Sequence, residues 1–156
     1  MQLGCTYLVV RDMENSIAFY EALLNMKADS RKLERWAQFH CGNTLALWNP
    51  EFDKELIREN NDVSAHFNEE YLKYKQDSKI RYGNNVILNF NVTDLNAEYE
   101  RVKSLDIGAV SEIFYINVVR PYYCFMLTDP DGNLIEITGD YEAIHEMLNI
   151  YKGKYT

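Results

Sequence analysis

Hydrophobic residues recur at helical spacing twice along this chain, and each time an aspartate precedes them. After Asp12 they stand one, five, eight and eleven residues further on, at Met13, Ile17, Tyr20 and Leu23. After Asp94 they stand at the same distances, at Leu95, Tyr99, Val102 and Leu105. This spacing gives a helix one apolar face, and the aspartate can accept hydrogen bonds from the first free backbone N–H groups. The pattern predicts two capped amphipathic helices, 82 residues apart.

Runs rich in β-forming residues surround both helices. Residues 3–10 and 86–92 precede them, and a hairpin follows each, at 35–48 around Gly42-Asn43 and at 124–138 around the turn 129–133. The two Gly-Asn pairs are 90 residues apart, so the second copy holds eight extra residues, expected within 107–123. A strand, a capped helix and further strands, present twice, predict a duplicated βαβββ module.

The rest of the chain is predicted to connect and extend these modules within one domain spanning 1–156. Module one covers about 3–49 and module two about 85–139. Between them lies a charged connector of about 50–84, in which Phe67, Tyr71 and Tyr74 predict a short helix. The connector is either a solvated surface insertion or a lid. Apolar spacing after Asp140 predicts a terminal helix at about 140–152 that covers the sheet or meets a partner chain.

Composition narrows the classes of partner. The 156 residues carry a formal net charge of −8, which argues against a nucleic-acid surface and favours a neutral or cationic ligand. The three cysteines form no C-x-x-C pair, so a disulfide scaffold is not expected. No apolar run approaches the roughly 20 residues of a membrane span, and the start lacks a signal-peptide layout. We therefore expect a cytoplasmic protein that binds neither nucleic acid nor membrane.

Three segments resemble a known family. The run YLVVRDMENSIAFYEALLNM, the run VTDLNAEYERVKSLDIGA and the run FMLTDPDGNLIEI are similar to the vicinal oxygen chelate superfamily. This superfamily includes glyoxalase I, bleomycin and fosfomycin resistance proteins, and extradiol dioxygenases. The resemblance covers most of 3–48 and 86–138. It implies an α+β fold in which two tandem βαβββ modules form curved mixed sheets around a cleft, and a homodimer.

The resemblance also implies where a metal would lie. Family enzymes hold a divalent metal with His, Gln or Glu side chains from the first and last strands of each module. In this sequence those positions hold Cys5, Ala46, Ile87 and Glu136. Alanine and isoleucine cannot coordinate a metal, and two ligands are too few for a stable site. The sequence therefore predicts no metal, no other cofactor, and neither the glyoxalase nor the dioxygenase mechanism.

Strand alternation predicts which residues face the cleft. Alternate residues share a face, so the positions just named define one side of each sheet. The candidate ligand-binding residues on that side are Tyr7, Trp36, Gln38, Trp48, Asn89, Asn91, Met126 and Glu136. The opposite side is almost purely aliphatic and predicts the core, with Leu8, Val10, Leu45, Leu47, Leu88, Phe90, Ile135 and Ile137. Apolar walls with a few polar groups are typical of small-molecule pockets.

Several of these residues have two interpretations. Trp36 and Trp48 either line a pocket or pack across the strands. Glu136 either anchors a ligand's amine or hydroxyl, or bonds internally to Asn89 or Asn91. Cys5 is either a small buried side chain or a nucleophile, and His40 is either an exposed histidine beside a turn or a base.

Three functions remain open from the sequence. The favoured one is a metal-free protein of the bleomycin-resistance kind that binds a small aromatic or cationic molecule. The second is a metal-independent isomerase or lyase that uses Glu136, His40 or Cys5 for acid–base chemistry, with Glu136 as the candidate catalytic residue. The third is a regulatory module whose cleft is filled by Tyr115, Tyr122 and Tyr123. A binding protein is favoured over an enzyme.

Overall fold

The chain folds into two compact units. The computed structural model describes residues 4–59, 63–77, 79–83, 86–117 and 121–142. Unit 1 comprises Met1–Val86 together with Asp129–Asn133, and unit 2 comprises Ile87–Thr128 and Leu134–Thr156. The turn 129–133 therefore belongs to unit 1, although it connects two strands of unit 2.

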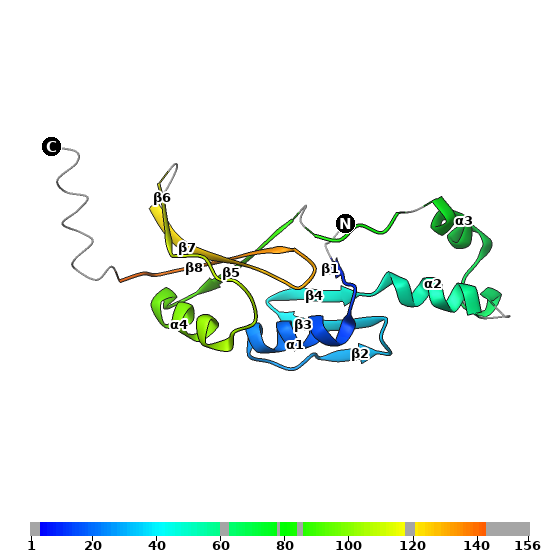
Figure 1. The fold of residues 1–156 in the computed structure, drawn as a ribbon, viewed down its shortest axis with the longest axis horizontal. Coiled ribbons are helices and arrows are strands. Elements are labelled where there is room, and N and C mark those ends of the chain that lie inside the picture. The colour runs from blue at the N-terminus through cyan, green and yellow to red at the C-terminus, as the bar shows by residue number, and fades with distance from the viewer. Residues whose placement is uncertain (1–3, 60–62, 78, 84–85, 118–120, 143–156) are drawn as a thin grey trace. The chain divides into compact units, whose positions relative to one another are not determined.

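Unit 1 is built on a four-stranded mixed sheet with one helix across it (Figure 1). Its elements are β1 (Thr6–Val9), α1 (Met13–Leu24), β2 (Ser30–Lys32), β3 (Trp36–Cys41) and β4 (Asn43–Trp48). The strand order is β1-β4-β3-β2, with β1 parallel to β4 and the other pairs antiparallel. The expected first module is confirmed, although β1 starts at Thr6 and is shorter than the run 3–10.

Helix α1 forms as its sequence predicts. The Asp12 side chain accepts a hydrogen bond from the Asn15 N–H at 2.9 Å, and the helix ends at Asn25 in the left-handed conformation (φ 50°). Its four predicted apolar positions are all buried. They pack against the aliphatic face of β3 and β4, where Leu45, Leu47 and Phe39 are also buried. The core of unit 1 lies between these two layers.

Unit 2 repeats this arrangement. Its elements are β5 (Ile87–Val92), α4 (Leu95–Leu105), β6 (Phe114–Asn117), β7 (Pro121–Thr128) and β8 (Leu134–Gly139), with strand order β5-β8-β7-β6. Asp94 caps α4 by accepting from the Ala97 N–H at 2.9 Å. The buried side chains of the sheet and the helix are Leu95, Tyr99, Val102, Phe125, Leu127, Ile135 and Ile137. The expected α+β fold of two tandem modules is confirmed.

The connector differs from its prediction. Its described residues form the helices α2 (Pro50–Glu59) and α3 (Glu69–Asp77), with a 3-10 turn at Val63–Ala65 between them. Only the second matches the expected short helix. The start of α2 has a sequence signal, since an asparagine followed by a proline is typical of a helix N-terminus. In the structure the Asn49 side chain caps α2 by accepting a hydrogen bond from the Glu51 N–H at 3.1 Å, and Pro50 occupies the first helical position. Of the predicted terminal helix at 140–152, all but 140–142 lies outside the described residues.

Candidate functional site

The sheet of unit 1 carries three aromatic side chains on the face away from α1. Trp36 on β3 lies directly opposite Trp48 on β4, and Tyr7 on β1 lies beside Ala46. The Tyr7 ring centroid is 5.4 Å from that of Trp36 and 6.2 Å from that of Trp48. Tyr7 is 54% exposed, and both tryptophans are partly exposed. We call Tyr7, Trp36 and Trp48 the aromatic platform.

The two indole N–H groups of the platform differ in their hydrogen bonding. Trp36 Nε1 donates to Gln38 Oε1 at 3.3 Å, so this predicted site residue is held beside the platform. Trp48 Nε1 is buried and has no acceptor among the described residues. A buried donor without an acceptor costs about 1–3 kcal/mol. The platform therefore contains one donor that is not satisfied within the described chain.

A lysine from the connector lies against the platform. Lys75 Nζ, on α3, lies 4.3 Å from the Trp48 ring centroid and 5.5 Å from that of Tyr71. Aromatic faces attract cations through their negative quadrupole, most strongly in tryptophan. The sequence did not indicate this residue, because charges on a helix such as α3 look like an ordinary solvated face.

Within unit 1, buried Asp53 links the two connector helices to each other and to the start of β3. Its carboxylate, on α2, is fully buried and accepts from Arg35 Nε at 2.5 Å and Arg35 Nη2 at 3.2 Å. The Tyr71 hydroxyl, on α3, donates to Asp53 Oδ2 at 3.0 Å. Burial and the nearby Asp53 carboxylate raise the pKa of Tyr71 to about 12. We call Asp53, Arg35 and Tyr71 the connector anchor, and it fixes the helix that carries Lys75.

In unit 2 the predicted polar residues form a hydrogen-bonded row across β5 and β8. Asn89 lies beside Glu136 in register, and Asn89 Nδ2 donates to Glu136 Oε1 at 2.8 Å. Thr138 Oγ1 donates to Asn91 Oδ1 at 2.8 Å. Of the two alternatives for Glu136, the structure thus contains the internal bond to Asn89. Met126, half-buried, lies opposite Glu136 on β7.

The three tyrosines proposed to fill a cleft do not share one face. Phe114 pairs with Cys124, Tyr115 with Tyr123 and Ile116 with Tyr122, so Tyr122 shares the face of Glu136 while Tyr123 points the other way. The Tyr123 ring lies 5.0 Å from Tyr115 and 4.6 Å from Tyr141. The expectation is wrong for Tyr115 and Tyr123, because neighbouring strand residues must alternate.

The candidate base and nucleophile of unit 1 are placed differently. His40 is exposed, and its Nδ1 lies 3.0 Å from Asp29 Oδ2, which also accepts from the His40 backbone N–H at 2.6 Å. These contacts lower the pKa of Asp29. Cys5 is half-buried, and burial raises the pKa of its thiol. A raised pKa reduces the thiolate population, which is the opposite of what activates a cysteine.

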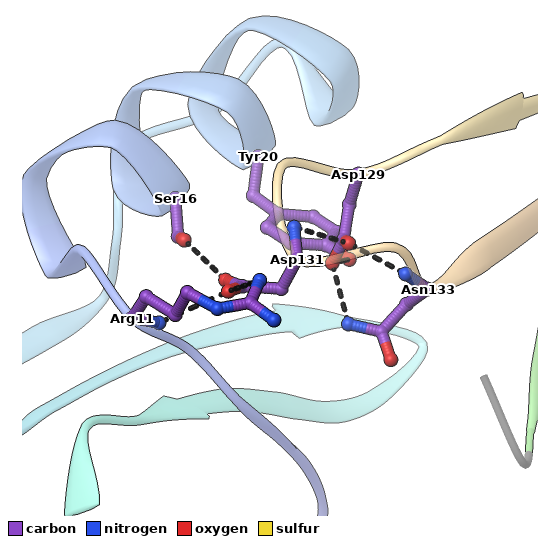
Figure 2. Close-up of polar contacts among 6 residues, drawn as sticks. All are labelled: Arg11, Ser16, Tyr20, Asp129, Asp131 and Asn133. Atoms are coloured by element: carbon purple, nitrogen blue, oxygen red, sulfur yellow. Dashed lines mark hydrogen bonds and ion pairs between the residues drawn. The ribbon is translucent and has the colours of Figure 1, made fainter. Parts of the chain in front are cut away.

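Two buried aspartates of the turn 129–133 accept hydrogen bonds from helix α1 and from Arg11, which precedes it (Figure 2). Asp129 accepts from the N–H groups of Asp131 (3.0 Å) and Asn133 (2.7 Å), from Asn133 Nδ2 (2.8 Å) and from the Tyr20 hydroxyl (2.8 Å). Asp131 accepts from the Arg11 backbone and guanidinium, both at 3.1 Å, and from Ser16 Oγ at 3.2 Å. We call Asp129 and Asp131 with their partners the turn clamp.

The clamp does more than the turn role expected for the two aspartates. Both side chains are almost fully buried, and burial raises the pKa of Asp131 against the opposing effect of its Arg11 and Ser16 hydrogen bonds. Burial and Asp129 together raise the pKa of Tyr20 far above its usual value of about 10. The clamp fixes the start of α1. Because α1 follows β1 closely in sequence, the clamp also fixes the C-terminal end of β1, the strand to which Tyr7 belongs.

We expect Tyr20→Phe to change the alkaline stability of the protein. The native state keeps the Tyr20 proton, whereas the unfolded state loses it above about pH 10. The contribution of Tyr20 to the free energy of unfolding therefore falls by about 1.4 kcal/mol per pH unit beyond that point. At pH 7 the variant should be less stable by about 1–3 kcal/mol, since it removes a hydrogen bond from a buried carboxylate.

Urea unfolding at pH 7 to 11 measures this difference. The stability gap between wild type and variant should narrow above pH 10. Tyr7→Phe, which alters an exposed tyrosine of the same unit, is the matched control. If the stability difference between wild type and Tyr20→Phe stays constant across this pH range, then the folded state does not retain the Tyr20 proton as expected.

Known proteins share this fold and this sequence pattern. Residues 2–137 match the model of the Glyoxalase/Bleomycin resistance protein/Dioxygenase superfamily. The chain belongs to this superfamily. No curated protein sequence gives a significant match.

Solved structures of the superfamily have the same fold at low sequence identity. A glyoxalase/bleomycin resistance protein/dioxygenase from Nocardioides is 22% identical, with a TM-score of 0.60, and the match covers 92% of this chain and 86% of that one. A glyoxalase-related enzyme from Fulvimarina pelagi is 17% identical, with a TM-score of 0.60 and coverage of 90% and 88%. A lactoylglutathione lyase from Agrobacterium tumefaciens is 19% identical, with a TM-score of 0.59 and coverage of 88% and 92%.

The superfamily's metal positions are poorly suited to a metal in this member. Ala46 is buried beside Tyr7, and neither alanine nor the exposed Ile87 supplies a donor atom. Glu136 is already hydrogen-bonded to Asn89. Within the described ranges no three His, Cys, Asp or Glu side chains come together as a metal would require. These residues do not fit the usual divalent metal.

No helix in the described part of the chain is long and apolar enough to cross a membrane.

Proposed function

We propose that this member of the glyoxalase and bleomycin resistance superfamily binds a small aromatic molecule without a metal, and that the aromatic platform is its binding surface. The observation that supports this proposal is that Tyr7, Trp36 and Trp48 lie together on a partly exposed sheet face. The Tyr7 ring centroid is 5.4 Å from that of Trp36 and 6.2 Å from that of Trp48. Offset or edge contacts between aromatic rings contribute about 0.5–1.5 kcal/mol beyond area burial. Ala46 and Ile87 at metal positions support metal-independent binding.

A catalytic role for Glu136 receives less support. An isomerase or lyase needs an acid or base free to meet its substrate, within hydrogen-bond reach. Glu136 instead accepts from Asn89 at 2.8 Å, and His40 is paired with Asp29. The homodimer, the single-domain organisation and the cytoplasmic location stay predictions from the sequence.

Trp48→Ala should weaken binding of an aromatic ligand about threefold to tenfold, because it removes one ring of the platform. A panel of one- and two-ring aromatic compounds, screened by thermal shift and titrated by calorimetry, provides the ligand. Trp48→Phe keeps a ring at this position and should lose less affinity. The proposal fails if no compound of the panel binds the wild type, or if Trp48→Ala binds as tightly as Trp48→Phe and the wild type.

The metal-free part of the proposal has its own test. Protein purified without chelator should contain far less than one transition metal per chain, and adding Zn²⁺, Ni²⁺, Mn²⁺ or Fe²⁺ should leave aromatic binding unchanged. Elemental analysis that finds about one such metal per chain in the wild type, and none in Glu136→Ala, would overturn it. That result would show a metal bound through the Glu136 carboxylate.

A further inference from the structure

The two tryptophans of the aromatic platform lie opposite each other on β3 and β4, but their indole N–H groups are not equivalent. Trp36 Nε1 donates to Gln38 Oε1 at 3.3 Å, whereas Trp48 Nε1 is buried and has no acceptor among the described residues. An indole N–H can only donate, so no shift of a proton within the ring relieves it. Trp48 is therefore the platform residue whose polar atom lacks a partner within the described chain.

The groups that contact the Trp48 ring do not take up this proton. The Tyr7 ring stands at 85° to the indole, with centroids 6.2 Å apart, and the Lys75 ammonium, which can only donate, lies 4.3 Å from the Trp48 centroid. The Trp48 residue is partly exposed, although its Nε1 atom is buried. A ligand atom therefore reaches Nε1 when a neighbouring side chain moves, and Tyr7, at 54% exposure, is the more exposed of these two neighbours.

A buried donor without an acceptor favours a ligand that supplies one. The free energy lost by leaving the N–H unpaired in the free protein is regained when a ligand atom accepts from it. A carbonyl oxygen accepts without bringing a donor of its own, so it satisfies the indole and leaves no new unpaired group. An aromatic hydrocarbon would contact the same rings and leave the N–H unpaired. The platform can thus distinguish ligands by whether they carry an acceptor.

We infer that the ligand of the aromatic platform is an aromatic carbonyl compound, whose ring lies against the platform and whose carbonyl oxygen accepts from Trp48 Nε1. This inference rests on the proposed function and adds the chemical class of the ligand. It gives Trp48 two roles, as a ring contact and as a donor. Trp36 has only the first role, since its N–H is already bonded to Gln38.

Two probes of nearly the same shape test this assignment. Acetophenone and α-methylstyrene share one ring and differ in a C=O group against a C=CH₂ group. Each is titrated by NMR into the full chain labelled with ¹⁵N in its indole groups. The chain has two tryptophans, so the spectrum contains two indole N–H signals, and Trp36→Phe assigns both by removing one. Acetophenone should move the Trp48 signal downfield, as a new hydrogen bond does, and α-methylstyrene should not.

The affinities of the two probes provide a second measurement. The ratio of acetophenone affinity to α-methylstyrene affinity should be about tenfold higher in the wild type than in Trp48→Phe, which keeps a ring but has no N–H. Trp36→Phe is the matched control, because it removes an N–H of the same platform that is already bonded. It should keep the wild-type ratio. The NMR shift is measured on the wild type, so the test does not depend on the folding of Trp48→Phe.

The outcomes separate this inference from the proposed function. If neither probe binds the wild type, the proposed function fails and this inference fails with it. If both probes bind and move the Trp48 signal equally, aromatic binding stands and the role of the Trp48 N–H is wrong. The same conclusion follows if Trp36→Phe lowers the affinity ratio as much as Trp48→Phe does.

Discussion

Asp129→Ala is expected to lower the free energy of unfolding by about 3–5 kcal/mol, the largest loss predicted for this protein. The carboxylate is 5% exposed and accepts from two backbone N–H groups, the Asn133 amide and the Tyr20 hydroxyl. Alanine leaves these donors without their acceptor, and each buried unsatisfied donor costs about 1–3 kcal/mol. Urea unfolding followed by circular dichroism measures the loss.

Two further variants separate the clamp from ordinary turn formation. Asp129→Asn keeps one oxygen for the two backbone N–H groups but turns an NH₂ toward Tyr20 or Asn133, so its loss should be intermediate. Asp12→Ala removes one exposed cap bond at 2.9 Å and should cost about 1 kcal/mol. Equal losses for Asp129→Ala and Asp12→Ala would show that the clamp contributes no more than a helix cap.

Asp53→Ala is expected to cost about 2–4 kcal/mol and to loosen the connector helices. It removes both bonds of Arg35 and the bond of Tyr71 to a fully buried carboxylate. The Arg35 side chain is 40% exposed, so water can hydrate its charge and the loss should stay below that of a fully buried ion left alone. Without this anchor, cleavage within 50–77 by trypsin should become faster.

Glu51→Ala is the control for this prediction, since it breaks the exposed pair with Lys54 on the same helix. Exposed ion pairs contribute about 0–1 kcal/mol, so this variant should unfold and be cleaved much as the wild type is. A similar stability and cleavage rate for Asp53→Ala and Glu51→Ala would mean that the anchor does not hold the connector.

The parts of the fold that the sequence predicted depend on neighbouring residues. The helices after Asp12 and Asp94 were readable because a cap and an apolar stripe act within a few turns, and both capping bonds are present at 2.9 Å. Alternation along the strands likewise separated the buried Leu47 and Ile137 from the partly exposed Trp48 and Glu136. Local periodicity was enough for the architecture.

The site's supporting contacts were not predictable in the same way. Tyr20 and Asp129 are 109 residues apart, and the Asp129 turn already had a sufficient local explanation. In the sequence, Asp53 is one of many charged residues in a polar connector. No local sequence pattern indicates that Arg35 is its partner. The same applies to Lys75, whose position follows from α3 being tied to Asp53. Such pairings depend on the three-dimensional fold and leave no periodic pattern.

The membership of 129–133 in unit 1 has a consequence for how the protein is made. The first 86 residues leave the ribosome long before the aspartates that bind Arg11, Ser16 and Tyr20, which lie 109 to 120 positions further on. Helix α1 and its sheet can collapse early, but the Tyr20 hydroxyl must wait for its acceptor during synthesis at about 5–20 residues per second. The first half of this duplicated chain is therefore completed only after most of the second half has been translated.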